Sequence, residues 1–127
     1  MSARSAACAC GGLRIHCEGE PLLVSACSCA ACRRRTGSAF GIAAFFEEGS
    51  VRIEGAARMF SRMSESGFAV EHQFCPACGT SLFWRPRRKP DFVAVAWGAF
   101  ADAAFPAPTQ SVNEEGKPGW LTFHLAD

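Results

Sequence analysis

Seven of the eight cysteines in the chain lie in three short clusters, with spacers of one or two residues inside each cluster. The clusters are Cys8 and Cys10, then Cys27, Cys29 and Cys32, and finally Cys75 and Cys78. Such spacing brings thiolates to one point, as a metal ion requires. Two pairs supply the four ligands of a closed zinc site, whereas three thiolates in one segment leave the open fourth position of a catalytic zinc. The sequence therefore predicts two zinc ions per chain, one for folding and one for chemistry.

The first and last clusters are interpreted as the two halves of the closed site. Cys75 and Cys78 frame a knuckle, and Gly79 after it allows the positive φ that such a turn often needs. Cys8 and Cys10 supply the second pair, so a shared metal would tie the N-terminus to the middle of the chain. The alternative is that one pair is only a tight turn with buried thiols.

The middle cluster is predicted to hold the open site. Three thiolates on Zn²⁺ carry a net charge of −1, and an incoming thiol at the fourth position would bind as a thiolate. The arginines Arg33, Arg34 and Arg35 follow at once, and a guanidinium matches the carboxylate of a substrate. The alternative makes Cys17 or His72 the fourth ligand of a second structural zinc. The open site is favoured because no further ligand is near in the sequence.

Composition and charge exclude several classes of protein. The length of 127 residues and a hydrophobic content of 49% favour one domain, residues 1–127, with a buried core. A net charge of +1 gives no reason to expect nucleic acid or an anionic membrane as a partner. No apolar run has the length of a signal peptide or of a transmembrane helix. We therefore expect a cytoplasmic protein, where paired cysteines favour metal over disulfide.

Hydrophobic periodicity predicts a mainly β fold. Apolar residues alternate with polar ones, or run on continuously, over 13–17, 42–46, 51–54, 68–74, 92–97 and 121–125. The only helix expected is a single turn over 30–35, which leaves the middle cysteine cluster. The sequence thus predicts short antiparallel strands joined by metal-binding loops.

The order of the motifs resembles one family. It runs Cys-x-Cys-Gly-Gly, then Cys-x-Cys-x-x-Cys-Arg-Arg-x-Thr-Gly-Ser-Ala-Phe, then Phe-Cys-x-x-Cys-Gly-Thr. This combination is similar to the glutathione-dependent formaldehyde-activating enzyme family, which includes centromere-protein-V-like domains. The resemblance implies a small single-domain fold of the β-tent type. It also implies a structural zinc on the first and last clusters, and a second zinc on the middle one, where the sulfur of glutathione meets formaldehyde.

The leading functional hypothesis is a zinc-dependent carbon–sulfur lyase-like enzyme. It would condense a small-molecule thiol such as glutathione with formaldehyde or a related aldehyde, and the resemblance implies S-hydroxymethylglutathione as the product. Within this hypothesis an arginine among Arg33, Arg34 and Arg35 binds a carboxylate of the thiol. Two alternatives stay open: a non-catalytic double-zinc β module that binds a ligand or protein, and a redox sensor whose middle cluster forms a disulfide.

Overall fold

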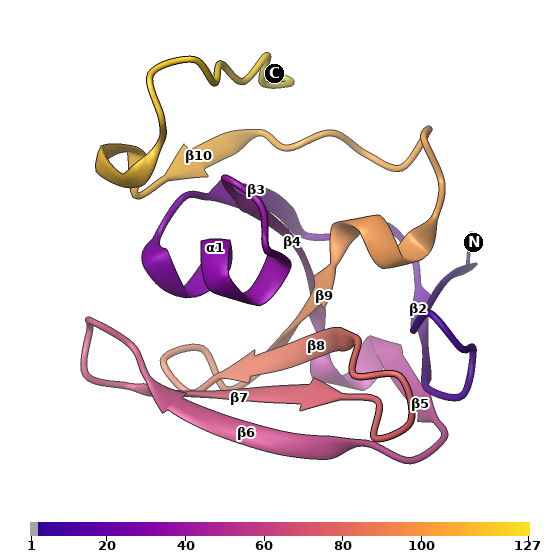
Figure 1. Ribbon diagram of the computed structural model, residues 1–127. Coiled ribbons are helices and arrows are strands. Elements are labelled where there is room, and N and C mark those ends of the chain that lie inside the picture. The colour runs from indigo at the N-terminus through magenta and orange to yellow at the C-terminus, as the bar shows by residue number, and fades with distance from the viewer. Residues whose placement is uncertain (1–2) are drawn as a thin grey trace.

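Two sheets form the framework of the computed structural model, which describes residues 3–127 (Figure 1). The smaller sheet has the strand order β1 (Ala3–Ala7), β2 (Arg14–Glu18) and β5 (Val51–Glu54). The larger sheet has the order β10 (Gln110–Val112), β3 (Leu23–Cys27), β4 (Gly41–Glu47), β9 (Phe92–Ala96), β8 (Ser81–Pro86), β7 (Ala69–Phe74) and β6 (Arg58–Met63). Neighbouring strands are antiparallel, except that β10 runs parallel to β3. The predicted mainly β fold of short strands is confirmed.

Period-two alternation within the strands divides the larger sheet into two different faces. On one face Phe46, Phe83 and Val95 are buried against the smaller sheet, where Ile15 is also fully buried. Burial of one such side chain stabilises a fold by about 1.5–3 kcal/mol. The other face carries a second apolar cluster that includes Trp84 and turns toward the α-helix Ala30–Thr36. The first face holds the fold together, and the second is free to build a site.

The helix α1 (Ala30–Thr36) is as short as the sequence predicted. It begins after Cys29, whose Sγ accepts a hydrogen bond from the backbone N–H of Cys32, and it ends at Gly37 in a left-handed conformation with φ 67°. None of its residues is buried. Three short 3-10 helices complete the regular structure of residues 3–127: η1 (Glu48–Ser50), η2 (Trp97–Phe100) and η3 (Glu114–Gly116).

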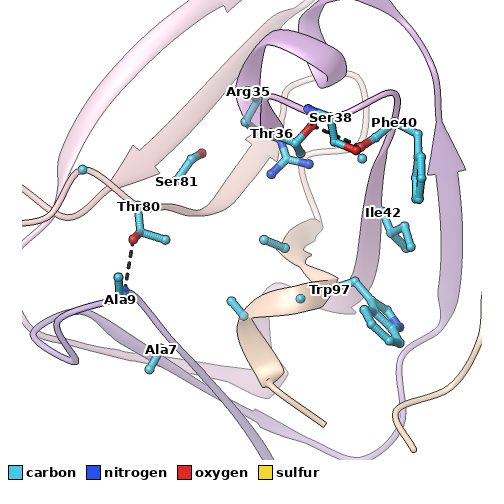
Figure 2. A pocket seen from close by; sticks show the side chains of 15 residues that line it. Ala7, Ala9, Arg35, Thr36, Ser38, Phe40, Ile42, Thr80, Ser81 and Trp97 are labelled. Carbon is cyan, nitrogen blue, oxygen red and sulfur yellow. Dashed lines mark hydrogen bonds between the residues drawn. The ribbon is translucent and has the colours of Figure 1, made fainter. Parts of the chain in front are cut away.

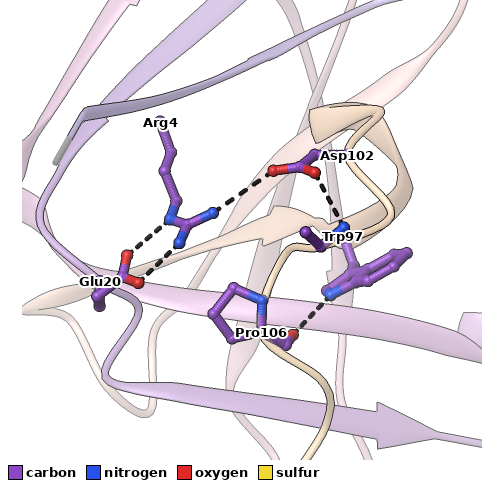
Figure 3. Close-up of polar contacts among 6 residues, drawn as sticks. Arg4, Glu20, Trp97, Asp102 and Pro106 are labelled. Atoms are coloured by element: carbon purple, nitrogen blue, oxygen red, sulfur yellow. Dashed lines mark hydrogen bonds and ion pairs between the residues drawn. The ribbon is translucent and has the colours of Figure 1, made fainter.

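Polar contacts fasten β1 to the segment that follows η2 (Figure 3). The Arg4 guanidinium donates from Nε to Glu20 at 2.6 Å, and its Nη1 lies 3.7 Å from an Asp102 carboxylate oxygen. The indole N–H of Trp97 donates to the Pro106 carbonyl at 2.9 Å. Such surface ion pairs each stabilise a protein by about 1 kcal/mol or less. Their role is to hold η2 in place against the smaller sheet.

The strand expected over residues 121–125 is wrong. Leu121 and Phe123 are half-buried while Thr122 and His124 are exposed, so the alternation is real, but the segment has no regular secondary structure. The ring of Phe123 packs edge-on against Phe40 with centroids 4.9 Å apart. The alternation therefore reflects side-chain packing of an extended tail without a partner strand. Within the part of the chain that the structure describes, no helix is long and apolar enough to cross a membrane.

Candidate metal centres and active site

The first and last cysteine clusters meet at one point. Cys8 and Cys10 lie in the turn between β1 and β2, and Cys75 and Cys78 lie between β7 and β8, where Gly79 has φ 79°. All four Sγ atoms lie within 4.8 Å of one another. The Sγ atom of Cys10 is 3.7 Å from that of Cys8 and 3.6 Å from that of Cys75. Tetrahedral zinc with bonds of about 2.3 Å places its sulfurs about 3.8 Å apart, so this four-cysteine cluster could hold zinc.

Hydrogen bonds orient the thiols of the four-cysteine cluster. The backbone N–H of Leu13 donates to Cys8 Sγ at 3.2 Å. The backbone N–H of Ala9 donates to the Thr80 hydroxyl at 3.0 Å, and that hydroxyl lies 3.2 Å from Cys78 Sγ. Hydrogen bonding with the Thr80 hydroxyl lowers the pKa of Cys78 to about 5. Donors that point at sulfur favour the thiolates that a metal requires.

The middle cluster forms a thiol triad of Cys27, Cys29 and Cys32. Cys27 is the last residue of β3, Cys29 caps α1, and Cys32 lies in its first turn, which brings the three Sγ atoms within 4.8 Å of one another. The amide of Asn113, just after β10, donates to Cys27 Sγ at 3.0 Å. Hydrogen bonding from the Cys32 thiol, with a further contribution from this amide, lowers the pKa of Cys27 to about 5. The triad could also hold zinc, because its sulfurs converge and one of them ionises readily.

Neither alternative fourth ligand reaches the triad. Cys17 is 1% exposed in the core between the sheets, where burial raises the pKa of its thiol to about 12. His72 accepts a hydrogen bond at Nε2 from Arg62. Among residues 3–127, the side chains that converge as potential metal ligands are those of the four-cysteine cluster and the triad, and neither set includes Cys17 or His72. The triad thus offers three potential protein ligands.

The triad opens on a cavity of about 690 Å³, here called the triad cavity. Its walls include Arg34, Arg62 and Asn113 as well as the loop of residues 63–66. A separate cavity of about 700 Å³ lies beside the loops of the four-cysteine cluster and is lined by Thr80, Trp97 and mostly apolar residues (Figure 2). The lining of that cavity does not include the triad. A reactant at the triad therefore occupies the triad cavity.

The three predicted arginines diverge. Arg33 donates from Nε to the backbone carbonyl of Ser28 at 3.1 Å, which holds it against the loop that carries the triad. Arg34 is exposed and lines the triad cavity. Arg35 turns away and stacks over the ring of Trp84, with its guanidinium carbon 4.2 Å from the ring centroid. These positions make Arg34 the member of the run that faces a ligand at the triad.

Two residues at the triad cavity were absent from the sequence prediction. Arg62 arrives from β6, and Asn113 is separated from its partner Cys27 by 86 residues. Neither stands in a motif of recognisable spacing. Only the pairing of β10 with β3 signals the position of Asn113, because Val112 lies opposite Cys27 in that register.

Comparison with known proteins assigns the family. The family model described as glutathione-dependent formaldehyde-activating enzyme matches residues 3–115. The chain belongs to this family. The resemblance inferred from the cysteine motifs is thereby confirmed, and membership supports a function of the glutathione-dependent formaldehyde-activating type at the level of the family.

Solved structures agree with this fold. A Rhodobacter sphaeroides protein, whose crystal structure was determined as a structural genomics target, is 25% identical with a TM-score of 0.59. The match covers 75% of this chain and 85% of that chain. No curated protein matches the chain. The family is generally enzymatic.

Proposed function

We propose that this family member is a zinc enzyme that joins a thiol such as glutathione to formaldehyde or a related small aldehyde. The observation that carries the proposal is the triad. Its three sulfurs converge at the wall of a cavity of about 690 Å³, and the described residues supply no fourth ligand. A closed structural site fills all four positions with protein ligands, whereas a catalytic site keeps one for a reactant.

In this proposal the two cysteine sets have different roles, one structural and one catalytic. Cys8, Cys10, Cys75 and Cys78 would hold a structural zinc, and Cys27, Cys29 and Cys32 would hold a catalytic one. Zinc bound at the triad would supply Lewis acidity, which favours the thiolate form of a bound thiol at neutral pH. Clustered free thiols of this kind suit a reducing compartment, so we place the reaction in the cytoplasm.

The chain's own residues position the reactants. Asn113 fixes the orientation of Cys27 by its hydrogen bond, and Arg33 holds the loop through the Ser28 carbonyl. Arg34, exposed at the triad cavity, is the candidate to pair with a carboxylate of glutathione. In the reaction the thiol sulfur bonds to the carbonyl carbon, and the thiol proton ends on the carbonyl oxygen. With formaldehyde the product is S-hydroxymethylglutathione, and the reverse reaction is that of a carbon–sulfur lyase.

Calorimetric titration of the zinc-loaded protein with glutathione and with uncharged 2-mercaptoethanol tests this proposal. Glutathione should bind about ten- to a hundredfold more tightly, since a charge-assisted pair contributes about 1.5–3 kcal/mol. Cys29→Ser should lose one zinc and the binding of both thiols. Arg34→Ala should lose the preference for glutathione, and Arg52→Ala, at an exposed arginine outside the triad cavity, is the control that should keep it.

The same titration decides between the enzyme and a non-catalytic double-zinc module. If glutathione does not bind to protein that holds two zinc ions, the enzyme proposal fails and a non-catalytic zinc module explains the fold better. If both thiols bind equally, the zinc chemistry stands but glutathione is not the thiol.

A further inference from the structure

A pocket of about 550 Å³ lies between α1 and the face of the larger sheet formed by β6, β7 and β8, and we call it the helix–sheet pocket. Figure 1 shows α1 lying above these three strands. The residues of its wall that matter here are Arg35, Arg62, Phe60, Phe74, His72 and Ser81. Arg62 also lines the triad cavity, so the pocket adjoins the proposed reaction site.

Strand register gathers these residues on one face. Phe60 on β6 pairs with His72 on β7, and Phe74 on β7 pairs with Ser81 on β8. Because side chains alternate along a strand, Arg62 lies on the same face of β6 as Phe60. Phe60 is 60% exposed, so an aromatic ring borders the pocket without covering it. The wall therefore combines an apolar part with guanidinium groups.

The pocket carries uncompensated positive charge. Arg34, Arg35 and Arg62 all line the pocket, and none of the ion pairs found among residues 3–127 includes one of them. Arg35 also lines the cavity beside the four-cysteine cluster, where a Cβ at Gly41 would lie 2.6 Å from its Nη2 atom. Three thiolates with one divalent ion at the triad carry a net charge of −1, which is less than the charge of the three arginines. The surplus favours an anionic ligand.

Two polar atoms in the wall have no partner. His72 is 8% exposed, and neither its Nδ1 nor the Oγ of Ser81 has a hydrogen-bond partner among the described residues. His72 Nε2 accepts a hydrogen bond from Arg62 Nε at 3.1 Å. Burial first, and then repulsion from Arg62 and Arg35, lowers the pKa of His72 to about 4, so the neutral ring carries its proton on Nδ1. Both atoms are covered by protein, so they lie behind the pocket surface and do not face a ligand.

We propose that the helix–sheet pocket binds the carbonyl substrate, and that this substrate is a 2-oxo acid with an apolar or aromatic substituent. The inference rests on the thiol addition of the proposed function, and it names a 2-oxo acid in place of a small aldehyde as the carbonyl substrate of the same site. Arg35 and Arg62 pair with the carboxylate, and Phe60 and Phe74 contact the substituent. Formaldehyde is neutral and has one carbon, so it would use none of these groups.

The reaction at such a substrate is the one proposed above. The thiol sulfur forms a bond to the 2-oxo carbon, the carbonyl double bond becomes a C–OH single bond, and the thiol proton ends on that oxygen. No oxidant or reductant takes part. A carboxylate next to the reacting carbon suits the arrangement, because Arg62 lies at the boundary between the pocket and the triad cavity.

The test is calorimetric titration of the zinc-loaded protein with phenylglyoxylate and with its methyl ester, which differ mainly in the carboxylate charge. The acid should bind at least about tenfold more tightly than the ester. Arg62→Gln should remove most of that preference, and Arg62→Lys should restore only part of it because lysine lacks the planar fork. Phe60→Ala should weaken both ligands alike.

Arg58→Gln is the matched control, because Arg58 lies on the same face of β6, outside the pocket wall. It should keep the preference for the acid. Equal binding of acid and ester, or an equal effect of Arg58→Gln and Arg62→Gln, would overturn the proposal. So would displacement of phenylglyoxylate by glutathione, which would assign the pocket to the thiol. Failure of the proposed function gives a different result: glutathione, titrated without phenylglyoxylate, does not bind the zinc-loaded wild type.

Discussion

The two cysteine sets should differ in how much each contributes to stability. Zinc at the four-cysteine cluster would close a long loop, because Cys10 and Cys75 are 65 residues apart. Zinc at the triad closes a segment of only five residues, from Cys27 to Cys32. The entropic cost of closing a loop of n residues grows as 1.5RT ln n. Closing the 65-residue loop therefore costs about 2.3 kcal/mol more than closing the 5-residue segment. A metal that holds the longer loop removes that much more entropy from the unfolded chain.

Cys75→Ser is therefore expected to destabilise the protein much more than Cys29→Ser. Serine at position 29 also preserves the helix, since Cys29 is the N-cap of α1 and serine is among the best N-cap residues. The difference of about 2.3 kcal/mol should separate the two melting temperatures by roughly 10 °C, and loss of the structural metal should add to it. Both variants should lose one zinc ion of two.

Zinc content and thermal unfolding, measured on the same preparations, test this expectation. Cys17→Ala is the control for loss of a cysteine, because Cys17 lies in the core and belongs to neither metal set. It should keep both zinc ions. Equal melting temperatures for Cys75→Ser and Cys29→Ser would refute the reasoning, and a lower one for Cys29→Ser would identify the triad as the structural site.

Three further predictions concern the fold. Gly116→Ala should destabilise it by about 1–3 kcal/mol in urea unfolding, because an added Cβ would collide with the Ser28 carbonyl oxygen. Gly119→Ala is its control and should leave the midpoint unchanged, since no atom lies within 4 Å of the added Cβ. Phe46→Ala should lower the free energy of unfolding by about 3–5 kcal/mol in the same assay, because this side chain is 1% exposed in the core. Lowering the pH from 6.5 toward 4 should destabilise the wild type more than His72→Gln in urea unfolding. The folded state holds the pKa of His72 at about 4, below its ordinary 6.5, so protons bind the unfolded chain more tightly than the folded one and favour unfolding. Identical pH dependence of the two proteins in urea unfolding would contradict the neutral, buried state of His72.

Local features of the sequence predicted much of what is local in the structure. Each cysteine cluster places its ligands within a few residues, so their spacing alone indicated the metal chemistry. The same holds for the short helix after Cys29 and for the positive φ of Gly79, which depend on the nearest neighbours along the chain. Period-two alternation identified the strand around Ile15, because one of its faces is buried. A continuous apolar run identified the strand around Val93, which is buried on both faces.

Alternation predicted a strand wrongly where the alternating segment has no neighbouring strand to pair with. Residues 121–125 alternate like a strand, yet Phe123 packs on Phe40 and the backbone pairs with no neighbouring strand. Strands of weak alternation, such as β6, were missed for the opposite reason. Hydrogen bonds to β7 define β6, while both of its faces are largely exposed.

Sequence patterns by themselves determined the two cysteine sets, the mainly β class and the family. Only the tertiary structure decided what surrounds the triad. It separated Arg33, Arg34 and Arg35 into three different environments, because successive helical residues point in different directions. It brought Arg62 and Asn113 to the same cavity through the pairing of distant strands, for which no local rule of spacing exists. Metal chemistry can be encoded within six residues, but a substrate pocket requires side chains from several strands, and their meeting depends on the whole sheet.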